Sequence, residues 1–109
     1  MSIKFFVREL SNGTDYQSLL KPPETHGLHS GRVYLKPQAD CGRHNTGAQE
    51  ETLIFLFGKG QAVIEDKTFP VGEGKVVYIP PNTEHNIVNN SEKPLCYIYC
   101  VVPVNGNGG

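Results

Sequence analysis

Residues 41–60, CGRHNTGAQEETLIFLFGKG, decide the fold together with residues 72–89, GEGKVVYIPPNTEHNIVN. In the first stretch His44 is followed seven residues later by Glu51, which opens a dense apolar run. The second stretch carries another histidine, His85. Two histidines and a carboxylate beside strand-like sequence form the chain's best candidate for a chemical site.

Alternation along a strand predicts which of these side chains lie together. Side chains at positions i and i+2 point to the same face, so His44 and Thr46 are expected to face one way. Glu51 is expected to share its face with Leu53, Phe55 and Phe57. If that face is the interior of a barrel, apolar walls flank Glu51 and exclude water from it.

The rest of the chain is rich in short apolar runs separated by Gly, Pro and Asn. Strands of four to six residues every eight to ten positions indicate an all-β sandwich or barrel. The expected strands are residues 3–7, 32–36, 52–57, 61–65, 68–71, 76–79, 85–89 and 95–102. Residues 11–23 are expected to be irregular, with at most one helical turn at 15–20.

Length and charge restrict the class of protein. A chain of 109 residues fits one domain, residues 1–109, ending in a flexible tail at 103–109. The net charge of −1 is not concentrated anywhere, so neither nucleic acid nor a membrane surface is expected as a partner. A small-molecule ligand is expected instead.

Cysteine usage and the N-terminus bear on the compartment. The apolar run near the start is broken by Lys4 and Arg8, and no stretch is long enough to span a membrane. The odd number of cysteines, in no C-x-x-C pattern, favours a reducing environment, so a cytoplasmic location is expected. These cysteines are Cys41, Cys96 and Cys100.

Residues 43–60 resemble the first conserved motif of the cupin superfamily. That motif runs H-x-H, three or four residues, E, six residues, G. Here His44 takes the first position, Glu51 the glutamate and Gly58 the glycine, while Thr46 stands where the second histidine is usual.

A second motif strengthens the resemblance. The cupin pattern G, five residues, P-x-G, two residues, H, three residues, N is matched by Gly74, Pro80, His85 and Asn89. Asn82 stands where glycine is usual, and Asn is one of the few residue types that tolerate the left-handed conformation.

The resemblance covers about residues 30–102 and implies a double-stranded β-helix, or jelly-roll barrel, with a pocket inside. Cupins with the full motif bind a metal through three histidines and a glutamate. The set that survives here is His44, Glu51 and His85, so we predict a divalent metal, with Fe, Mn, Ni, Co and Zn all compatible. Thr46 is a poor ligand when neutral, but its hydroxyl could hold a metal-bound water.

Several alternatives stay open from the sequence. Gln49, Glu50, His26 or His29 could fill the vacancy at position 46, although the six-residue count to the glycine selects Glu51 over Glu50, and the other two histidines are expected in a loop. The three candidate ligands could also form a hydrogen-bonded polar cluster without metal. Arg43 is expected on the surface.

The function that the resemblance implies is equally coarse. We expect binding of, or action on, a small polar molecule, with oxygenase-type or isomerase-type chemistry if the protein is an enzyme. The alternative is a non-catalytic binding or sensing barrel, with or without metal. Exposed sheet edges and apolar outer faces predict a homodimer.

Overall fold

The computed structural model describes residues 3–105, which form nine strands and no helix. The strands are β1 (Gln17–Leu20), β2 (His29–Leu35), β3 (His44–Asn45), β4 (Gln49–Phe57), β5 (Lys59–Ile64), β6 (Lys67–Gly72), β7 (Val76–Ile79), β8 (Glu84–Val88) and β9 (Leu95–Pro103). Short strands joined by tight turns are what the sequence predicts for most of the chain.

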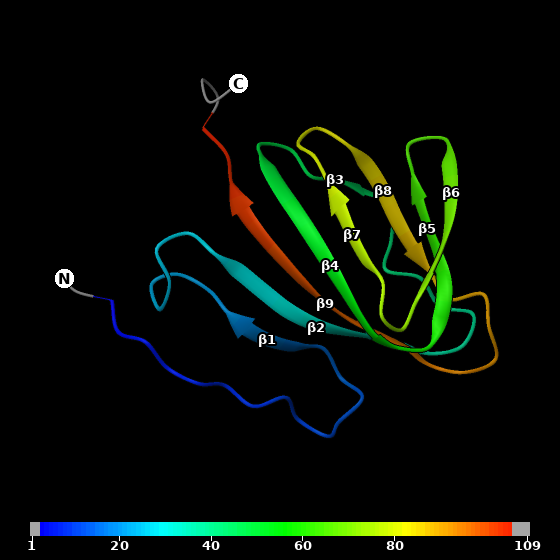
Figure 1. The fold of residues 1–109 in the computed structure, drawn as a ribbon, viewed down its shortest axis with the longest axis horizontal. Coiled ribbons are helices and arrows are strands. Elements are labelled where there is room, and N and C mark those ends of the chain that lie inside the picture. The colour runs from blue at the N-terminus through cyan, green and yellow to red at the C-terminus, as the bar shows by residue number, and fades with distance from the viewer. Residues whose placement is uncertain (1–2, 106–109) are drawn as a thin grey trace.

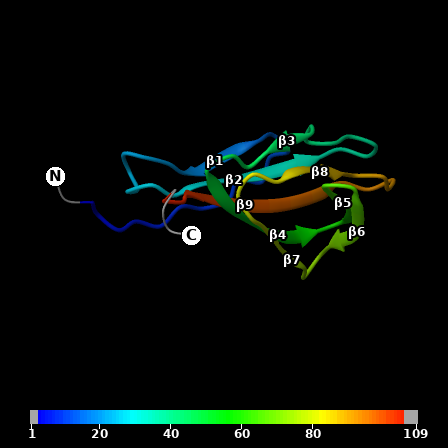
Figure 2. The ribbon, with the colours of Figure 1, turned by 90° about the horizontal axis from the view of Figure 1, so that it is seen from above.

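The strands make two antiparallel sheets. One has the order β1-β2-β9-β4-β7 and the other the order β3-β8-β5-β6 (Figure 1). Seen edge-on, the molecule is a flattened sandwich with the N-terminal segment running along its outside (Figure 2). Apart from β1–β2 and β5–β6, neighbours in each sheet are not consecutive in the chain, as in a jelly roll, and the predicted all-β double-stranded β-helix is confirmed.

The core fills the space between the two sheets. Along β4, Leu53 and Phe55 are each only 2% exposed, whereas Ile54 between them is 40% exposed on the outer face. A bulge between Phe55 and Phe57 shifts the register with β9, and Phe57 is 42% exposed. The expectation that Phe57 shares the inner face is therefore wrong, because the extra residue of a bulge breaks the two-residue alternation.

Two residues of the second motif, Asn82 and Asn89, stabilise the turns on either side of β8. Asn89 is fully buried, and the two hydrogens of its side-chain amide are shared among the carbonyls of Lys93 and of the adjacent Leu35 and Lys36, which ties the end of β2 to the turn between β8 and β9. Asn82 has φ of 55°, in the left-handed region that its identity predicts.

The N-terminal segment departs from prediction. Residues 3–7 were expected as a strand, but they form no ladder. Side-chain contacts hold the residues that follow, 8 and 9, against the sheet. Arg8 donates to the Leu19 carbonyl and forms an ion pair with Glu24. The Gln17 amide donates to the Glu9 carbonyl. These side-chain bonds take the place of backbone pairing.

The predicted helical turn at 15–20 is also wrong, because β1 occupies that stretch and pairs with β2. Pairing with an existing strand overrides the weak local preference. β2 begins at His29, earlier than expected, and β4 begins at Gln49. In the predicted tail, Pro103 still belongs to β9, and residues 106–109 lie outside the described residues.

Candidate metal centre

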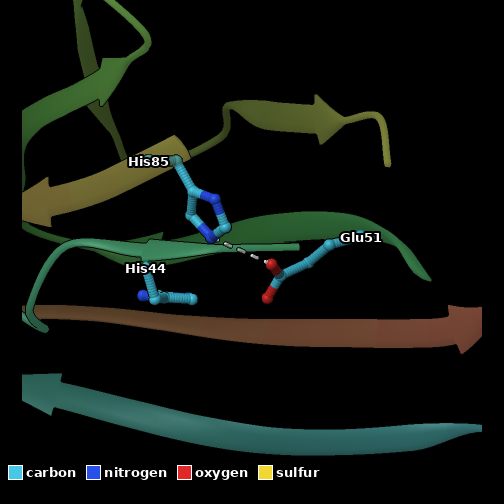
Figure 3. A group of neighbouring side chains, drawn as sticks. All are labelled: His44, Glu51 and His85. Carbon is cyan, nitrogen blue, oxygen red and sulfur yellow. Dashed lines mark ion pairs between the residues drawn. The ribbon is translucent and has the colours of Figure 1, made fainter. Parts of the chain in front are cut away.

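Three strands bring the candidate ligands together between the sheets. Glu51 comes from β4 in the five-stranded sheet, while His44 and His85 come from β3 and β8 in the other (Figure 3). The two histidines are direct partners in the β3–β8 ladder, so their side chains leave the sheet side by side. The short strand β3 therefore delivers one ligand next to the other.

The distances suit a shared cation. One ligand atom from each of His44, Glu51 and His85 lies within 4.8 Å of the other two. His85 Nε2 is 3.2 Å from Glu51 Oε1, and the two imidazole rings have centroids 4.1 Å apart. Ligand atoms that are each about 2.1 Å from one metal ion stand about 3–4 Å apart, so small side-chain adjustments would complete such a site.

Backbone carbonyls orient both imidazoles. His44 Nδ1 lies 2.9 Å from the carbonyl oxygen of Gly42, and His85 Nδ1 lies 3.0 Å from that of Thr83. A carbonyl only accepts hydrogen bonds, so each Nδ1 carries the hydrogen. In the neutral ring Nε2 then holds a lone pair, which is the form that binds a metal, and the carbonyl contact fixes its direction.

One buried atom stands out. The side chain of His85 is 2% exposed and that of Glu51 is 12% exposed, so their contact is shielded from water. His85 Nε2 nevertheless has no aligned hydrogen-bond partner in the described chain, although Glu51 Oε1 is within ion-pair distance. A buried nitrogen without a partner is costly, and a cation between it and the carboxylate would satisfy both.

Protonation responds to the same surroundings. Burial acts to lower the pKa of His85, but the contacts with the Glu51 carboxylate and the Thr83 carbonyl outweigh it, so the pKa is raised overall. Without metal, His85 therefore holds its proton to a higher pH than an ordinary histidine does.

Thr46 lies beside the centre rather than in it. It is buried, and its hydroxyl donates to the Pro80 carbonyl at 2.7 Å and accepts from the Thr83 amide at 3.0 Å. The single hydroxyl hydrogen is thus in use, which leaves none to donate to a metal-bound water. Thr46 instead fastens the loop whose Thr83 carbonyl orients His85.

Of the polar residues next to the candidate ligands, Glu50 and Arg43 face away from the centre, whereas Gln49 does not. Glu50 accepts a hydrogen bond from Tyr78 on the outer face of the sheet, so Glu51 is the carboxylate on the inner side. Arg43 is exposed and pairs with Glu84. Gln49 is half-buried, at the same strand parity as Glu51.

Phe55 packs in the core against Tyr97. It therefore belongs to the apolar core on the inner face of β4, four residues along the strand from Glu51, and makes no polar contact with the centre.

The two remaining histidines, His26 and His29, lie in different parts of the structure. His26 lines a groove beside the N-terminal segment. His29, expected in a loop, opens β2, where it pairs with Val101, which in turn pairs with Glu51 on the far side. His29 therefore shares the inner face with Glu51, two strands away, or about 10 Å at the usual strand spacing.

The inner face also carries two tyrosines of β9, and the sequence pattern alone does not show whether they face the core or the outside. In the structure, Tyr97 and Tyr99 both point to the inner face. Burial raises the pKa of both hydroxyls, Cys41 adds to the rise at Tyr97, and Tyr16 adds to the rise at Tyr99. Nothing in the sequence pattern predicted Tyr16 beside them.

Comparisons with known proteins agree with this geometry. The profile of the cupin domain family matches residues 31–102. A cupin protein from Bacteroides fragilis superposes with a TM-score of 0.81 at 19% identity, covering 98% of this chain and 92% of that one. A predicted oxalate decarboxylase from Thermotoga maritima gives a TM-score of 0.78 at 22% identity, covering 82% and 79%.

One curated relative is closer in sequence. Uncharacterized protein MJ1618 of Methanocaldococcus jannaschii is 35% identical over 60 residues, which span 55% of this chain and 48% of that protein. The chain thus aligns with about half of that relative's length. Within residues 3–105 there is no helix of the length and hydropathy needed to cross a membrane.

Proposed function

The chain belongs to the cupin domain family, and from that premise we propose that it binds a divalent metal ion through His44, Glu51 and His85. A metal held by these three residues would leave room for a small polar molecule between the sheets. Two imidazoles and one carboxylate are compatible with Fe(II), and also with Mn, Ni, Co or Zn.

A single observation carries the proposal: the buried Nε2 of His85 faces the Glu51 carboxylate without an aligned hydrogen bond. Both histidines already have Nδ1 directed at a carbonyl, so the lone pairs of their other nitrogens are free for a metal. The donor set and the shielded contact between His85 and Glu51 fit a cation, while His44 is exposed and completes the set at its open side.

The chemistry follows from the donor set. When bound, such a metal supplies a Lewis acid or a redox centre with open positions. The backbone carbonyls of Gly42 and Thr83 keep the hydrogen of each imidazole on Nδ1. The buried side chains of Leu53 and Phe55 on the same strand as Glu51 exclude water from the inner face. Oxygenase-type and isomerase-type reactions both suit this arrangement.

One observation favours the second candidate, a binding or sensing barrel without catalysis. The inward-facing tyrosines of β9, Tyr97 and Tyr99, both have pKa values raised above the ordinary value, so both phenols stay protonated at neutral pH and neither can serve as a general base. A reaction that needs a strong general base other than the ligands therefore has little support here.

The inner surface also bears on the ligand. The Thermotoga maritima neighbour is described as a predicted oxalate decarboxylase, and at 22% identity the likeness concerns the fold. None of the inward-facing residues of β2, β4 and β9 is a lysine or arginine. Such a surface favours a neutral or singly charged ligand over a dicarboxylate.

The test is metal analysis of the purified protein after loading with each of the five metals and dialysis. We expect one equivalent in the wild type and at least about a hundredfold weaker binding in Glu51→Gln and His44→Ala, because even changes to the partners of metal ligands cost 10- to 100-fold. Glu50→Gln is the matched control, since it removes the adjacent carboxylate on the outer face.

Retention of full metal affinity in Glu51→Gln, or no metal in the wild type under any loading condition, would overturn the proposal. Oxygen uptake by the iron-loaded protein with a panel of small carbonyl compounds then separates catalysis from binding. Silence across the panel favours the binding barrel.

A further inference from the structure

An aromatic ring from outside the barrel fills a gap in its inner wall. Gly31 lies on the inner face of β2, opposite Tyr99 of β9, and has no side chain to cover that point. Tyr16, which directly precedes β1, occupies this space: a Cβ added at Gly31 would collide with the Tyr16 ring. The next residue, Gln17, bonds on the opposite side to Ser11 and Glu9, so alternation turns Tyr16 inward.

The two tyrosines form a pair. Their rings stack with centroids 6.4 Å apart and an interplanar angle of 17°, and their hydroxyls are hydrogen-bonded to each other. A phenol has one hydrogen to donate, so the pair spends one of its two hydrogens internally. Within residues 3–105 neither hydroxyl has another hydrogen-bond partner, which leaves one O–H to be donated elsewhere.

The pair lies near the candidate metal centre. Tyr99 is two residues from Val101, which is the direct ladder partner of Glu51. Diagonal neighbours of this kind stand roughly 7–8 Å apart on one face of a sheet. The hydroxyls themselves lie over Gly31 on β2, one strand further from Glu51. A small molecule with one end at the metal and the other at the hydroxyls therefore has to reach across β9, roughly 10 Å at the usual strand spacing.

We propose that the hydroxyl pair of Tyr16 and Tyr99 recognises an oxygen atom of a small carbonyl- or hydroxyl-bearing ligand whose other end occupies the centre formed by His44, Glu51 and His85. This inference rests on the proposed metal site and adds the ligand class. A phenol donates to a carbonyl, hydroxyl or singly charged oxygen, and no lysine or arginine faces inward from β2, β4 or β9 to balance a dianion.

A packing role for Tyr16 makes a different prediction. If the ring served only to cover Gly31, replacing tyrosine by phenylalanine would change nothing beyond stability, since the ring stays. If the hydroxyls recognise a ligand, the same substitution weakens ligand binding without affecting the metal. Tyr16→Phe and Tyr99→Phe therefore separate the two roles.

The experiment uses the zinc-loaded protein, because zinc is diamagnetic. 4-Oxopentanohydroxamate, whose hydroxamate binds zinc through two oxygens and whose ketone oxygen lies toward the other end, is titrated by calorimetry and by NMR of protein carrying ¹³C at the tyrosine Cζ position. We expect the Cζ signals of Tyr16 and Tyr99 to shift, and each phenylalanine variant to bind 4-oxopentanohydroxamate about three- to tenfold more weakly at unchanged zinc stoichiometry, the range for one lost hydrogen bond. Tyr78→Phe, on the outer face, should bind as the wild type does.

Each outcome decides something. Equal affinity in the wild type, Tyr16→Phe and Tyr99→Phe, or no binding to the zinc-loaded wild type, overturns the hydroxyl pair. Tighter binding of oxalate than of 4-oxopentanohydroxamate overturns the ligand class. If the wild type holds no zinc, the proposed metal site is wrong for zinc, independently of the tyrosines. The same titration of the metal-free protein then tests the hydroxyl pair: a shift of both Cζ signals supports it, and no shift overturns it.

Discussion

At the scale of single residues, the contact between His85 and Glu51 can be completed by a proton or by a metal ion. The hydrogen on His85 Nδ1 is directed at the Thr83 carbonyl, so Nε2 meets the carboxylate with a lone pair unless something positive lies between them. Protons and metal ions therefore compete for one place. The centre should respond to pH in opposite directions in the two states.

The metal-free protein gives the first pH prediction. The pKa of His85 is raised in the folded state above its ordinary value of 6.5, so the protonated pair contributes stability that is fully present below pH 6.5 and is lost as the pH rises through the folded pKa. Glu51→Gln removes the charge that raises the pKa. We expect the difference in unfolding free energy between wild type and Glu51→Gln, measured by urea denaturation with EDTA present, to shrink as the pH rises above 6.5.

The zinc-loaded protein should behave in the opposite sense. Binding requires neutral imidazoles, so the increase in melting temperature caused by zinc should grow over the same pH range. An increase that stays constant with pH would contradict the assignment of His85 as a ligand, and Glu50→Gln should follow the wild type throughout.

Residue spacing predicted the three clustered side chains but not what surrounds them. His44, Glu51 and His85 follow from two motifs read along the chain. The hydroxyl of Thr46 bonds residues 34 and 37 positions away, and no local pattern encodes such contacts. Tyr16 is a similar case, since its partner Tyr99 is 83 positions away and only the fold brings them together.

At the scale of elements, the turn between β4 and β5 determines how the strand carrying Glu51 meets the rest of the barrel. Gly58 has φ of 91°, and a Cβ there would lie 2.7 Å from Leu95 Cα and closer still to the Pro94 carbonyl oxygen. The glycine is needed both for its backbone conformation and for the close approach of the segment before β9.

A comparison of two glycines tests this. Gly74 has a similar φ of 84°, but a Cβ there would meet nothing within 4 Å. We expect Gly74→Ala to cost about 1 kcal/mol from backbone strain alone, and Gly58→Ala clearly more, about 3 kcal/mol or above, because the clash with backbone atoms adds to the strain. Urea denaturation of both variants measures the difference, and equal costs would show that the close approach relaxes without penalty.

The elements with strong alternation were predicted, and those without it were not. β7 matches the expected residues 76–79, because a run of β-branched and aromatic residues between turn signals leaves little choice. β1 was missed because its sequence, QSLL, has no such signal and becomes a strand only by pairing with β2. Residues 3–7 are the opposite case: their apolar sequence predicts a strand, but they pair with no other strand in the described chain.

At the scale of the whole molecule, the outer face of the five-stranded sheet is covered unevenly. The N-terminal segment lies against the end near Leu28 and Val102, where it forms one side of a groove. On β4 and β7, Ile54 and its ladder partner Val76 are 40% and 67% exposed. The same strands carry Tyr78, which is 58% exposed.

We propose that a second copy of the chain covers this apolar area. Sedimentation velocity at micromolar concentration should give a homodimer for the wild type, whose stability requires about 1,200–2,000 Å² of buried surface in total. The double variant Ile54→Lys, Val76→Lys places two charges in that interface and should be monomeric. Val7→Lys, on the N-terminal segment and 93% exposed, should remain dimeric. A monomeric wild type, or dissociation by Val7→Lys alone, would show that the dimer does not form through the outer face of β4 and β7.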